Sequence, residues 1–364
     1  MTTYEKSGVN VNKGNEASKI FYEAAKETWK NRQNGLGEII VPNDDFSGVR
    51  AIDVSSLPIG TLMNMGFDGV GTKIEIAERM NRHDTIAFDL FAMVCDDAIV
   101  RKAEPIAIGS ILDFNKLDIN IVKQLAKGYV EAAKEANVVV VNGEIAELGN
   151  RVNGFNEHNY NWGSTIIWFV NKNKILTGKE INIDNSIVAL EEKGFRSNGF
   201  SLLRKILHEK YGENWHEKEL DDEKIGNLAL IPSKIYSKIA VEMFGGVKDD
   251  EKIKINGIVH VTGGGVPEKL ERILKISGFG AELDNLFSPC KLMLHCQEIG
   301  NVSDKEAYKT WCMGQGLLII TPEPKKVIEY CLENNINAKI CGKVTENKAI
   351  KIKSKGLNGE ELVF

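Results

Sequence analysis

The sequence lacks the features that mark membrane, secreted and nucleic-acid-binding proteins. None of its apolar runs approaches the roughly 18 residues that a membrane span needs. The first residues have neither a basic start nor an apolar core, so we expect no signal peptide and a cytoplasmic location. No block of lysine or arginine stands out and the net charge is −5, which argues against nucleic acid as a partner.

Cysteine and histidine are few and scattered. The six cysteines form no Cys-x-x-Cys pair and the six histidines are equally dispersed, so we expect no zinc site. Without a secretory signal, the thiols are expected to be reduced. Cys312 has no histidine nearby in the sequence to activate it. It is therefore predicted to be a bystander thiol and not a nucleophile.

The composition and the order of elements indicate two α+β domains. With 364 residues, 43% apolar and 27% charged, the chain resembles a soluble globular protein too long for one core. Helical and strand patterns alternate in two series that divide near residue 180, so we predict domains at 1–180 and 181–364. The predicted helices are 15–30, 84–101, 118–136, 199–209, 233–244, 267–275 and 325–334. The predicted strands are 61–67, 105–113, 138–141, 164–170, 186–190, 257–261, 316–321 and 338–344.

The most informative motif is Asp-Gly-Val-Gly-Thr-Lys, which runs from Asp68 to Lys73 after an apolar strand. Gly69 and Gly71 allow backbone N–H groups to approach an anion, and Lys73 supplies a point charge for phosphate. Asp68 would act on a phosphate only through a divalent metal that both groups touch. The spacing is not that of a Walker A loop. The alternative is an ordinary tight turn with a solvated lysine.

The second predicted helix is apolar on almost all sides and yet carries Asp89, Asp96 and Asp97. Unpaired carboxylates are costly to bury, so these need cations, backbone donors or a metal. One interpretation is salt bridges to Arg82 or Arg101. The other is a divalent metal shared with the preceding motif, and the two acidic segments together favour it.

A third acidic segment follows the short valine-rich strand, where Glu144 comes after Asn142 and Gly143. A carboxylate at a strand end points into the cleft that the sheet borders, and Glu147 either shares that cleft or faces solvent. Scattered carboxylate oxygens of this kind suit magnesium. The predicted magnesium ligands are Asp68, Asp89, Asp97 and Glu144.

Two polar loops in the second half are candidate anion sites. Thr262, Gly263, Gly264 and Gly265 precede a helix with a proline in its first turn, which exposes free N–H groups at a helix N-terminus. The loop of Arg196, Ser197 and Asn198 opens another helix with hydroxyl, amide and guanidinium donors. The alternative for the first loop is a structural glycine turn.

Eight strings of the chain occur in the order of one enzyme family. They are Tyr4-x-x-Ser-Gly8-Val9, Asp68 to Lys73, His83-Asp-Thr-Ile-x-x-Asp89-Leu-x-Ala-Met93, Ala103-Glu-Pro105, Gly143-Glu144-x-Ala-Glu147, Ser197-Asn-Gly-Phe-Ser-Leu-x-Arg-Lys-Ile-Leu207, Thr262 to Gly265 and Gly300-Asn-Val302. In these strings the chain resembles the phosphoribosylformylglycinamidine cyclo-ligases, the aminoimidazole ribonucleotide synthetases of purine biosynthesis. The resemblance covers nearly the whole chain.

The resemblance implies a two-domain α+β fold shared with selenophosphate synthetase, thiamine-monophosphate kinase and a hydrogenase-maturation factor. In that superfamily the N-terminal domains pair into a homodimer with a central β-barrel, and the C-terminal domain is α/β. The cofactors implied are ATP and Mg²⁺, and the substrate is formylglycinamidine ribonucleotide. ATP would phosphorylate the formyl-amide oxygen, and the amidine nitrogen would then displace phosphate and close the imidazole ring.

The resemblance also assigns roles to residues of this chain. Lys73, Asp68 and Arg196 would be catalytic, and Lys73→Ala is expected to leave the fold intact and abolish turnover. The ATP-binding residues would be Gly69, Gly71, Thr72, Lys73, Asp89 and Glu144. The substrate-binding residues would be Ser197, Asn198, Thr262, Gly263, Gly264 and Gly265.

The chain departs from the family pattern mainly on the substrate side. The family usually has histidine where this chain has Arg196, and an arginine cannot accept a proton at neutral pH. The family's glycine-rich loop is reduced to Gly35-Leu-Gly37, Asn142 replaces a glycine, and Cys312-Met-Gly-Gln-Gly316 replaces Asn-Met-Gly-Val-Gly. Two alternatives therefore stay open. One is a diverged ATP-dependent enzyme acting on another amide or phosphorylated amine. The other is a nucleotide-binding protein without turnover.

Overall fold

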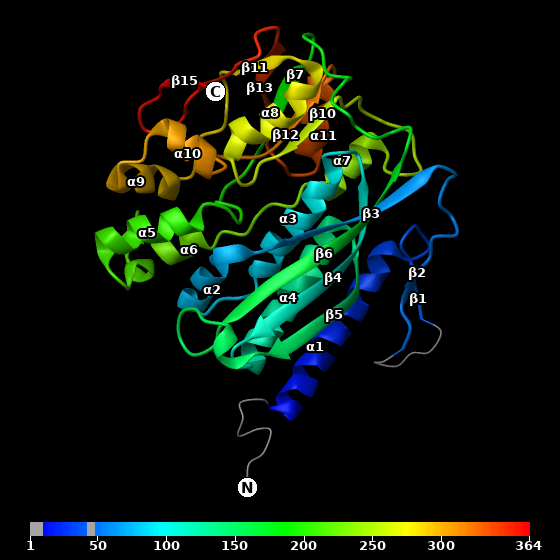
Figure 1. Ribbon diagram of the computed structural model, residues 1–364, viewed down its shortest axis with the longest axis vertical. Helices are drawn as coiled ribbons and strands as arrows, with labels where there is room; N and C mark the ends of the chain where they lie inside the picture. The colour runs from blue at the N-terminus through cyan, green and yellow to red at the C-terminus, as the bar shows by residue number, and fades with distance from the viewer. Residues whose placement is uncertain (1–9, 42–47) are drawn as a thin grey trace.

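Two β-sheets, one in each half of the chain, organise the computed structural model, which describes residues 10–41 and 48–364 (Figure 1). The motif at Tyr4 to Val9 lies outside these residues. The first half contains α1 (Val11–Trp29), η2 (Lys30–Arg32), β1 (Ile39–Ile40), β2 (Ala51–Ile52), β3 (Thr61–Gly69), η3 (Gly71–Lys73), α2 (Ile74–Met80), α3 (Ile86–Ile99), β4 (Glu104–Phe114), α4 (Ile119–Ala136), β5 (Val139–Glu147), η4 (Gly149–Arg151) and β6 (Tyr160–Asn171).

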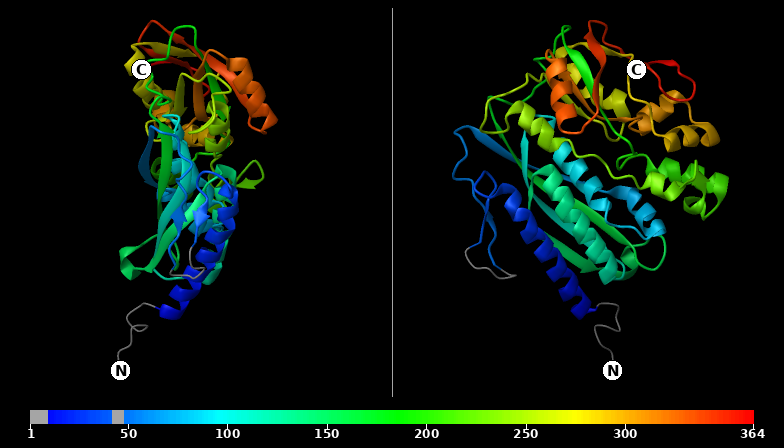
Figure 2. Two further views of the ribbon diagram at one scale, coloured as in Figure 1. Left: turned by 90° about the vertical axis from the view of Figure 1, so that its right-hand side faces the viewer. Right: turned by 180° about the vertical axis from the view of Figure 1, so that it is seen from behind.

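The N-terminal sheet has the strand order β3-β6-β4-β5, in which only β4 and β5 run parallel. Helices α1, α3 and α4 cover one face, and no helix of the described chain lies on the other (Figure 2). Strand alternation shows the difference: Ser110 and Leu112 of β4 are buried, whereas Ile111, which stands between them, is 57% exposed. Phe67 of β3 is 72% exposed. One apolar sheet face is therefore open.

The C-terminal half forms a seven-stranded mixed sheet with the order β10-β12-β7-β13-β11-β14-β15. Its elements are β7 (Ser186–Glu191), α5 (Phe200–Tyr211), η5 (Trp215–Glu217), β8 (Glu219–Leu220), β9 (Glu223–Lys224), α6 (Ile225–Ala229), α7 (Ser237–Phe244), β10 (Gly257–His260), α8 (Gly265–Ser277), β11 (Gly280–Leu283), α9 (Lys291–Gly300), α10 (Asp304–Thr310), β12 (Gln315–Thr321), α11 (Pro324–Glu333), β13 (Ala338–Thr345), β14 (Ile350–Lys353) and β15 (Glu361–Val363). Strand β10 forms one edge of this sheet.

Helix α3 joins the two halves because it contacts elements of both. On one side it lies against β3, β4 and β6, and on the other it contacts α7 and the edge strand β10. Its sequence explains the position: apart from the exposed Asp97 and the half-buried Phe88, all of its residues are buried. None of the described helices is both long and apolar enough to cross a membrane.

The predicted elements are present, with differences at their ends. The strand predicted at 138–141 continues as β5 to Glu147, so Glu144 lies within a strand and not after one. The helix predicted from residue 233 begins at Ser237. Helices α2, α6, α9 and α10 and strands β1, β2, β8, β9, β11, β14 and β15 were not predicted. These are short, and tertiary contacts stabilise short segments that propensity alone does not.

Candidate functional site

The motifs from both halves meet at one junction. Helix η3 contacts the N-terminal part of α5, and α3 contacts β10, whose last residue leads into the glycine loop before α8. The Asp-Gly-Val-Gly-Thr-Lys motif therefore faces the two polar loops that were predicted from sequence. Gly71 and Thr72 are exposed at this junction, whereas Lys73 is buried.

Two carboxylates, Asp68 and Asp97, lie close enough to influence each other's ionisation. Partial burial and the charge of Asp97 raise the pKa of Asp68, although the Gly69 N–H donates to its Oδ1 at 2.7 Å. Asp97 remains 54% exposed at its side chain. Lys269, in the second turn of α8, exerts an opposite charge on both acids. Paired oxygen ligands of this kind suit a hard divalent cation.

His260 contacts the carboxylate of Asp97 from the buried side of the junction. Its Nδ1 lies 2.8 Å from Asp97 Oδ1, and its side chain is only 2% exposed. Burial lowers the pKa of His260 to about 4, so the ring is neutral near pH 7. Burial alone would raise the pKa of Asp97, but the hydrogen bond from His260 lowers it. Asp97 is therefore an ionised carboxylate on the solvent side of the junction.

Arg196, predicted to be catalytic, is fully buried beneath this site and touches no solvent. Its Nη1 donates to Glu192 Oε2 at 2.8 Å, and its Nη2 donates to Asp96 Oδ2 at 2.9 Å. Although burial would lower it, these two carboxylates hold the pKa of the guanidinium above its usual value. Both terminal nitrogens of the guanidinium are therefore bonded to protein groups, whereas Nε is buried without a partner among the described residues. Direct contact between Arg196 and a substrate is thus not what the structure shows.

Lys73 and Asp89 form a second buried ion pair, 2.7 Å between Nζ and Oδ1, with both side chains 0% exposed. Lys73 also donates to the Ile231 carbonyl at 2.6 Å, and the Ser233 hydroxyl donates to Asp89 at 2.6 Å. The salt-bridge interpretation therefore holds for Asp89 and Asp96. Their partners are Lys73 and Arg196, and not Arg82 or Arg101. Asp89 is placed as a partner of Lys73 and not beside the exposed acids.

Glu144 lies on the other face of the N-terminal sheet from Asp68. Asp68 pairs with Ser164, which pairs with Ser110, and this row faces the helices. Glu144 pairs with Ile111 in the adjacent row, on the open face. Across residues 10–41 and 48–364, no three His, Cys, Asp or Glu side chains lie close enough to hold one metal. The expected convergence of four acids on one cation is thus not found within the single chain.

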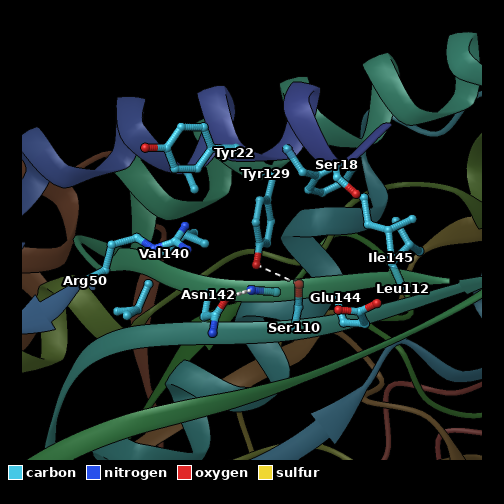
Figure 3. Close-up of a pocket in the computed structure, with 14 residues that line it drawn as sticks. Ser18, Tyr22, Arg50, Ser110, Leu112, Tyr129, Val140, Asn142, Glu144 and Ile145 are labelled. Carbon is cyan, nitrogen blue, oxygen red and sulfur yellow. Dashed lines mark hydrogen bonds between the residues drawn. The ribbon is translucent and has the colours of Figure 1, made fainter. Parts of the chain in front are cut away.

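A separate pocket of about 240 Å³ lies between α1 and the edge strand β5 (Figure 3). Its lining combines the rings of Tyr22 and Tyr129 with Asn142 and Glu144 of β5. The Arg50 guanidinium lies 5.3 Å from the Tyr22 ring centroid. Figure 3 shows Tyr129 reaching down from α4 to Ser110, 2.8 Å away. Glu144 lines this pocket and also a second one, of about 630 Å³, whose lining includes Phe67 and Ile111 of the open sheet face together with Asp68 and Gly69.

The two polar loops that were predicted to bind the substrate lie side by side. The Asn198 amide nitrogen lies 3.7 Å from the position that a Cβ at Gly263 would occupy. Gly265 has a φ of +63°, and a Cβ there would clash with the Tyr308 carbonyl. Ser197 Oγ and Asn198 Oδ1 are buried and are without a hydrogen-bond partner among the described residues. Such atoms are available to a ligand.

Two residues of the junction, His260 and Lys269, were not singled out from sequence. His260 stands two residues before Thr262, and Lys269 follows the glycine loop by one helical turn. In the sequence, their closeness to the glycine loop is the one feature that could have identified them. They lie beside Asp97 because α3 crosses β10. Cys312 is buried and burial raises its pKa to about 12, in agreement with a bystander thiol.

Comparison with known families matches both halves of the chain. The N-terminal domain of AIR synthase related proteins matches residues 52–160, and their C-terminal domain matches residues 182–355. The phosphoribosylformylglycinamidine cyclo-ligase of Pyrococcus horikoshii is 32% identical over 361 residues, which are 98% of this chain and 99% of that protein. The protein of the same name from Methanocaldococcus jannaschii is 34% identical over 299 residues, covering 81% of this chain and 80% of its own.

Solved structures share the fold at low sequence identity. Thiamine-monophosphate kinase from Stenotrophomonas maltophilia superposes with a TM-score of 0.63 at 12% identity, covering 93% of this chain and 97% of its own. The hydrogenase maturation protein HypE of E. coli has a TM-score of 0.61 at 14% identity and 96% coverage of both chains. A HypE structure in complex with ATP has a TM-score of 0.57 at 14% identity, covering 88% and 87%. The two-domain α+β prediction is confirmed.

The buried position of Lys73 predicts that its removal destabilises the protein, contrary to the expectation from sequence. Lys73→Met leaves Asp89 buried without its cation, and we expect a loss of about 3–5 kcal/mol in the free energy of unfolding. The double variant Lys73→Met/Asp89→Asn should recover most of that loss, because no unpaired charge remains. Urea unfolding followed by circular dichroism measures both. Equal stability of Lys73→Met and the parent protein would contradict the buried pair.

Proposed function

Because the chain belongs to the phosphoribosylformylglycinamidine cyclo-ligase family, we propose that it cyclises formylglycinamidine ribonucleotide to aminoimidazole ribonucleotide with ATP. ADP and phosphate are the other products. The structural observation that supports this is the juxtaposition of Asp68 and Asp97 with the donor-rich loops at 197–198 and 262–265. Acids for a metal–nucleotide and donors for a phosphorylated substrate thus face one another.

The proposed reaction has two chemical steps. The formyl-amide oxygen of the substrate attacks the γ-phosphorus of ATP, and the bond to ADP breaks. The amidine nitrogen then attacks the carbon that bears this oxygen, and the carbon–oxygen bond breaks to release phosphate. The amide nitrogen loses its proton when its oxygen is phosphorylated, and the attacking nitrogen loses its proton as the ring closes. A proton then moves from the ring methylene to the remaining imine nitrogen, and the ring becomes aromatic. In such phosphoryl transfers, the protein mainly positions the groups and neutralises charge.

Asp68 and Asp97 are the residues that would hold a magnesium ion. Both are carboxylates with oxygen atoms near solvent, and their mutual repulsion would be relieved by a divalent cation. When bound, such an ion neutralises negative charge on the phosphates of ATP. Lys269 adds a further positive charge near Asp97. Gly71 and Thr72 are proposed to approach the nucleotide with their backbone N–H groups, whereas the Gly69 N–H donates to Asp68 Oδ1.

The substrate is proposed to lie against the two C-terminal loops. The first turn of α8 presents N–H groups behind Thr262, Gly263 and Gly264, a geometry that favours the phosphate of a ribonucleotide. The unpartnered atoms of Ser197 and Asn198 are suited to hydrogen bonds with the formylglycinamidine amide. No proton transfer is assigned to Arg196, because it is buried and permanently charged.

The open sheet face is proposed to pair with a second copy of the chain. Met65, Phe67 and Ile111 are 47%, 72% and 57% exposed, and strand register places all three on the uncovered face. Contiguous exposed apolar side chains mark association surfaces. Pairing of two four-stranded sheets through this face would form the homodimer that the family resemblance implies.

The proposed activity is tested with purified chain, ATP and formylglycinamidine ribonucleotide. We expect ADP and aminoimidazole ribonucleotide in equal amounts, and an approximately 10²-fold loss of turnover in Asp68→Asn and in Asp97→Asn, because each removes charge stabilisation of the phosphates. Asp184→Asn, an exposed acid away from the junction, serves as the control with unchanged turnover.

Three outcomes separate the proposal from its alternatives. ADP formation that depends on a different amide, with none from formylglycinamidine ribonucleotide, would identify a diverged enzyme of the same superfamily. ATP binding without ADP formation would identify a nucleotide-binding protein without turnover. Full activity of both acid variants would remove Asp68 and Asp97 from the site.

Phe67→Asp is expected to dissociate the dimer, because a charge in a buried apolar interface is strongly unfavourable. In sedimentation equilibrium the parent chain should have twice the 40.4 kDa mass of one chain, and the variant should shift toward one chain mass. Leu332→Asp is the matched control, since Leu332 is 53% exposed on α11 of the other half. A monomeric parent chain would contradict pairing through this face.

A further inference from the structure

We propose that Lys269 is a further catalytic residue, which holds the γ-phosphoryl group of ATP while this group passes to the substrate. Lys269 lies in the second turn of α8, and the glycine loop at 262–265 leads into this helix. Its charge acts on Asp68 and Asp97, the two acids proposed to hold magnesium. The residue therefore stands between the nucleotide side and the substrate side of the junction, and this inference rests on the proposed function.

The two cations that the sequence analysis placed in catalysis cannot reach a phosphate. Lys73 is paired with Asp89, and both side chains are 0% exposed. Arg196 is paired with Asp96, and both of these side chains are also 0% exposed. A transferring phosphoryl group spreads negative charge over its oxygens, so its site needs a cation that can contact them. Another residue of the junction must therefore supply that cation.

Lys269 is half-buried, and no protein group binds its ammonium. Within the described part of the chain, its side chain makes no ion pair and no hydrogen bond. Glu268, its neighbour in the sequence, is paired with Arg272 instead. Partial burial and the charge of Arg272 lower the pKa of Lys269 more than the nearby acids raise it. All three N–H donors of the ammonium are thus available to an anionic ligand.

The space beside Lys269 is not filled by protein. A cavity of about 170 Å³ lies between α3, β10 and α8, and its lining includes Asp97, Lys269 and Arg272. The side chain of Asp97 is 54% exposed. A carboxylate that suits a divalent cation and an unpaired ammonium therefore line the same cavity. A phosphate held by a metal at Asp97 would lie near Lys269 as well.

The order of the elements indicates which phosphate Lys269 contacts. The two acids lie on β3 and α3, whereas the proposed substrate loop precedes α8. During the reaction only the γ-phosphoryl group moves from the nucleotide to the substrate, so a cation between the two meets this group before and after the transfer. Lysine binds phosphate as a point charge, and stabilising the charge of the transferring group is the main task of the protein in such reactions. In this role Lys269 forms no covalent bond and transfers no proton.

Nucleotide binding tests the contact without turnover. Equilibrium dialysis measures the affinity of the chain for labelled ATP and for labelled ADP, each with magnesium chloride and without the amide substrate. We expect Lys269→Met to weaken ATP binding by about tenfold and to leave ADP binding within about twofold, because only ATP carries the γ-phosphate. Equal weakening for both nucleotides would show that Lys269 acts on the two acids and not on the γ-phosphate. That result would overturn the proposal.

Lys275→Met is the matched control, since Lys275 is an exposed lysine in the last turn of the same helix. It removes the same charge at a distance from the junction, and we expect parent affinities for both nucleotides. Urea unfolding should give one midpoint for the parent and both methionine variants, because no protein group binds the ammonium of Lys269. A lower midpoint in Lys269→Met alone would assign this lysine a structural role and contradict the proposal.

Turnover with formylglycinamidine ribonucleotide separates this proposal from the proposed function. We expect Lys269→Met to lose kcat by about 10²-fold, and Lys269→Arg, which keeps the charge, to stay within about tenfold of the parent chain. An active parent chain together with an unchanged kcat in Lys269→Met would overturn the role of Lys269 and leave the proposed function standing. A parent chain that prefers ATP through Lys269 but forms no aminoimidazole ribonucleotide would refute the proposed function and leave the contact with the γ-phosphate standing.

Discussion

Burial of carboxylates on one apolar helix is the constraint on which the rest of this structure depends. Helix α3 lies between the two sheets, and an ionised Asp89 or Asp96 there would be strongly unfavourable without a cation. Lys73 from the first half and Arg196 from the second supply those cations. The Asp96–Arg196 ion pair crosses between the two halves, so they are joined by an ion pair as well as by apolar contact, and their loops are brought together at the same place.

The same arrangement separates supporting acids from exposed ones. Asp96 and Asp97 are neighbours in the sequence, but the first is fully buried against Arg196 and the second projects to solvent beside Asp68. His260 links these two aspartates, since it contacts Asp97 directly and also contacts Arg196, the ion-pair partner of Asp96. A departure from the family pattern at position 196 is therefore accommodated behind the site. The arginine contacts Asp96 and His260 and lies in the buried layer below the exposed carboxylate.

Much of this could be predicted from the sequence, and the failures have a common cause. The long elements and both glycine loops were found because their patterns are local. The metal interpretation of Asp89 was favoured because the preceding motif carries a second acid, Asp68, yet Asp89 pairs with Lys73, sixteen residues away. Glu144 was placed at a strand end, but its strand continues and its pleat turns the side chain to the opposite face from Asp68. Which cation meets which acid is decided by long-range packing.

The sequence by itself determined the family, the two-domain α+β architecture and the segments that carry the chemistry, because motif order and hydrophobic period are properties of the chain alone. Only the tertiary structure decided which carboxylates are neutralised and which are free. It also decided that Lys73 and Arg196 face inward and that His260 stands behind Asp97. These assignments depend on distances between residues far apart in the sequence, and those distances exist only once α3 lies between the two sheets.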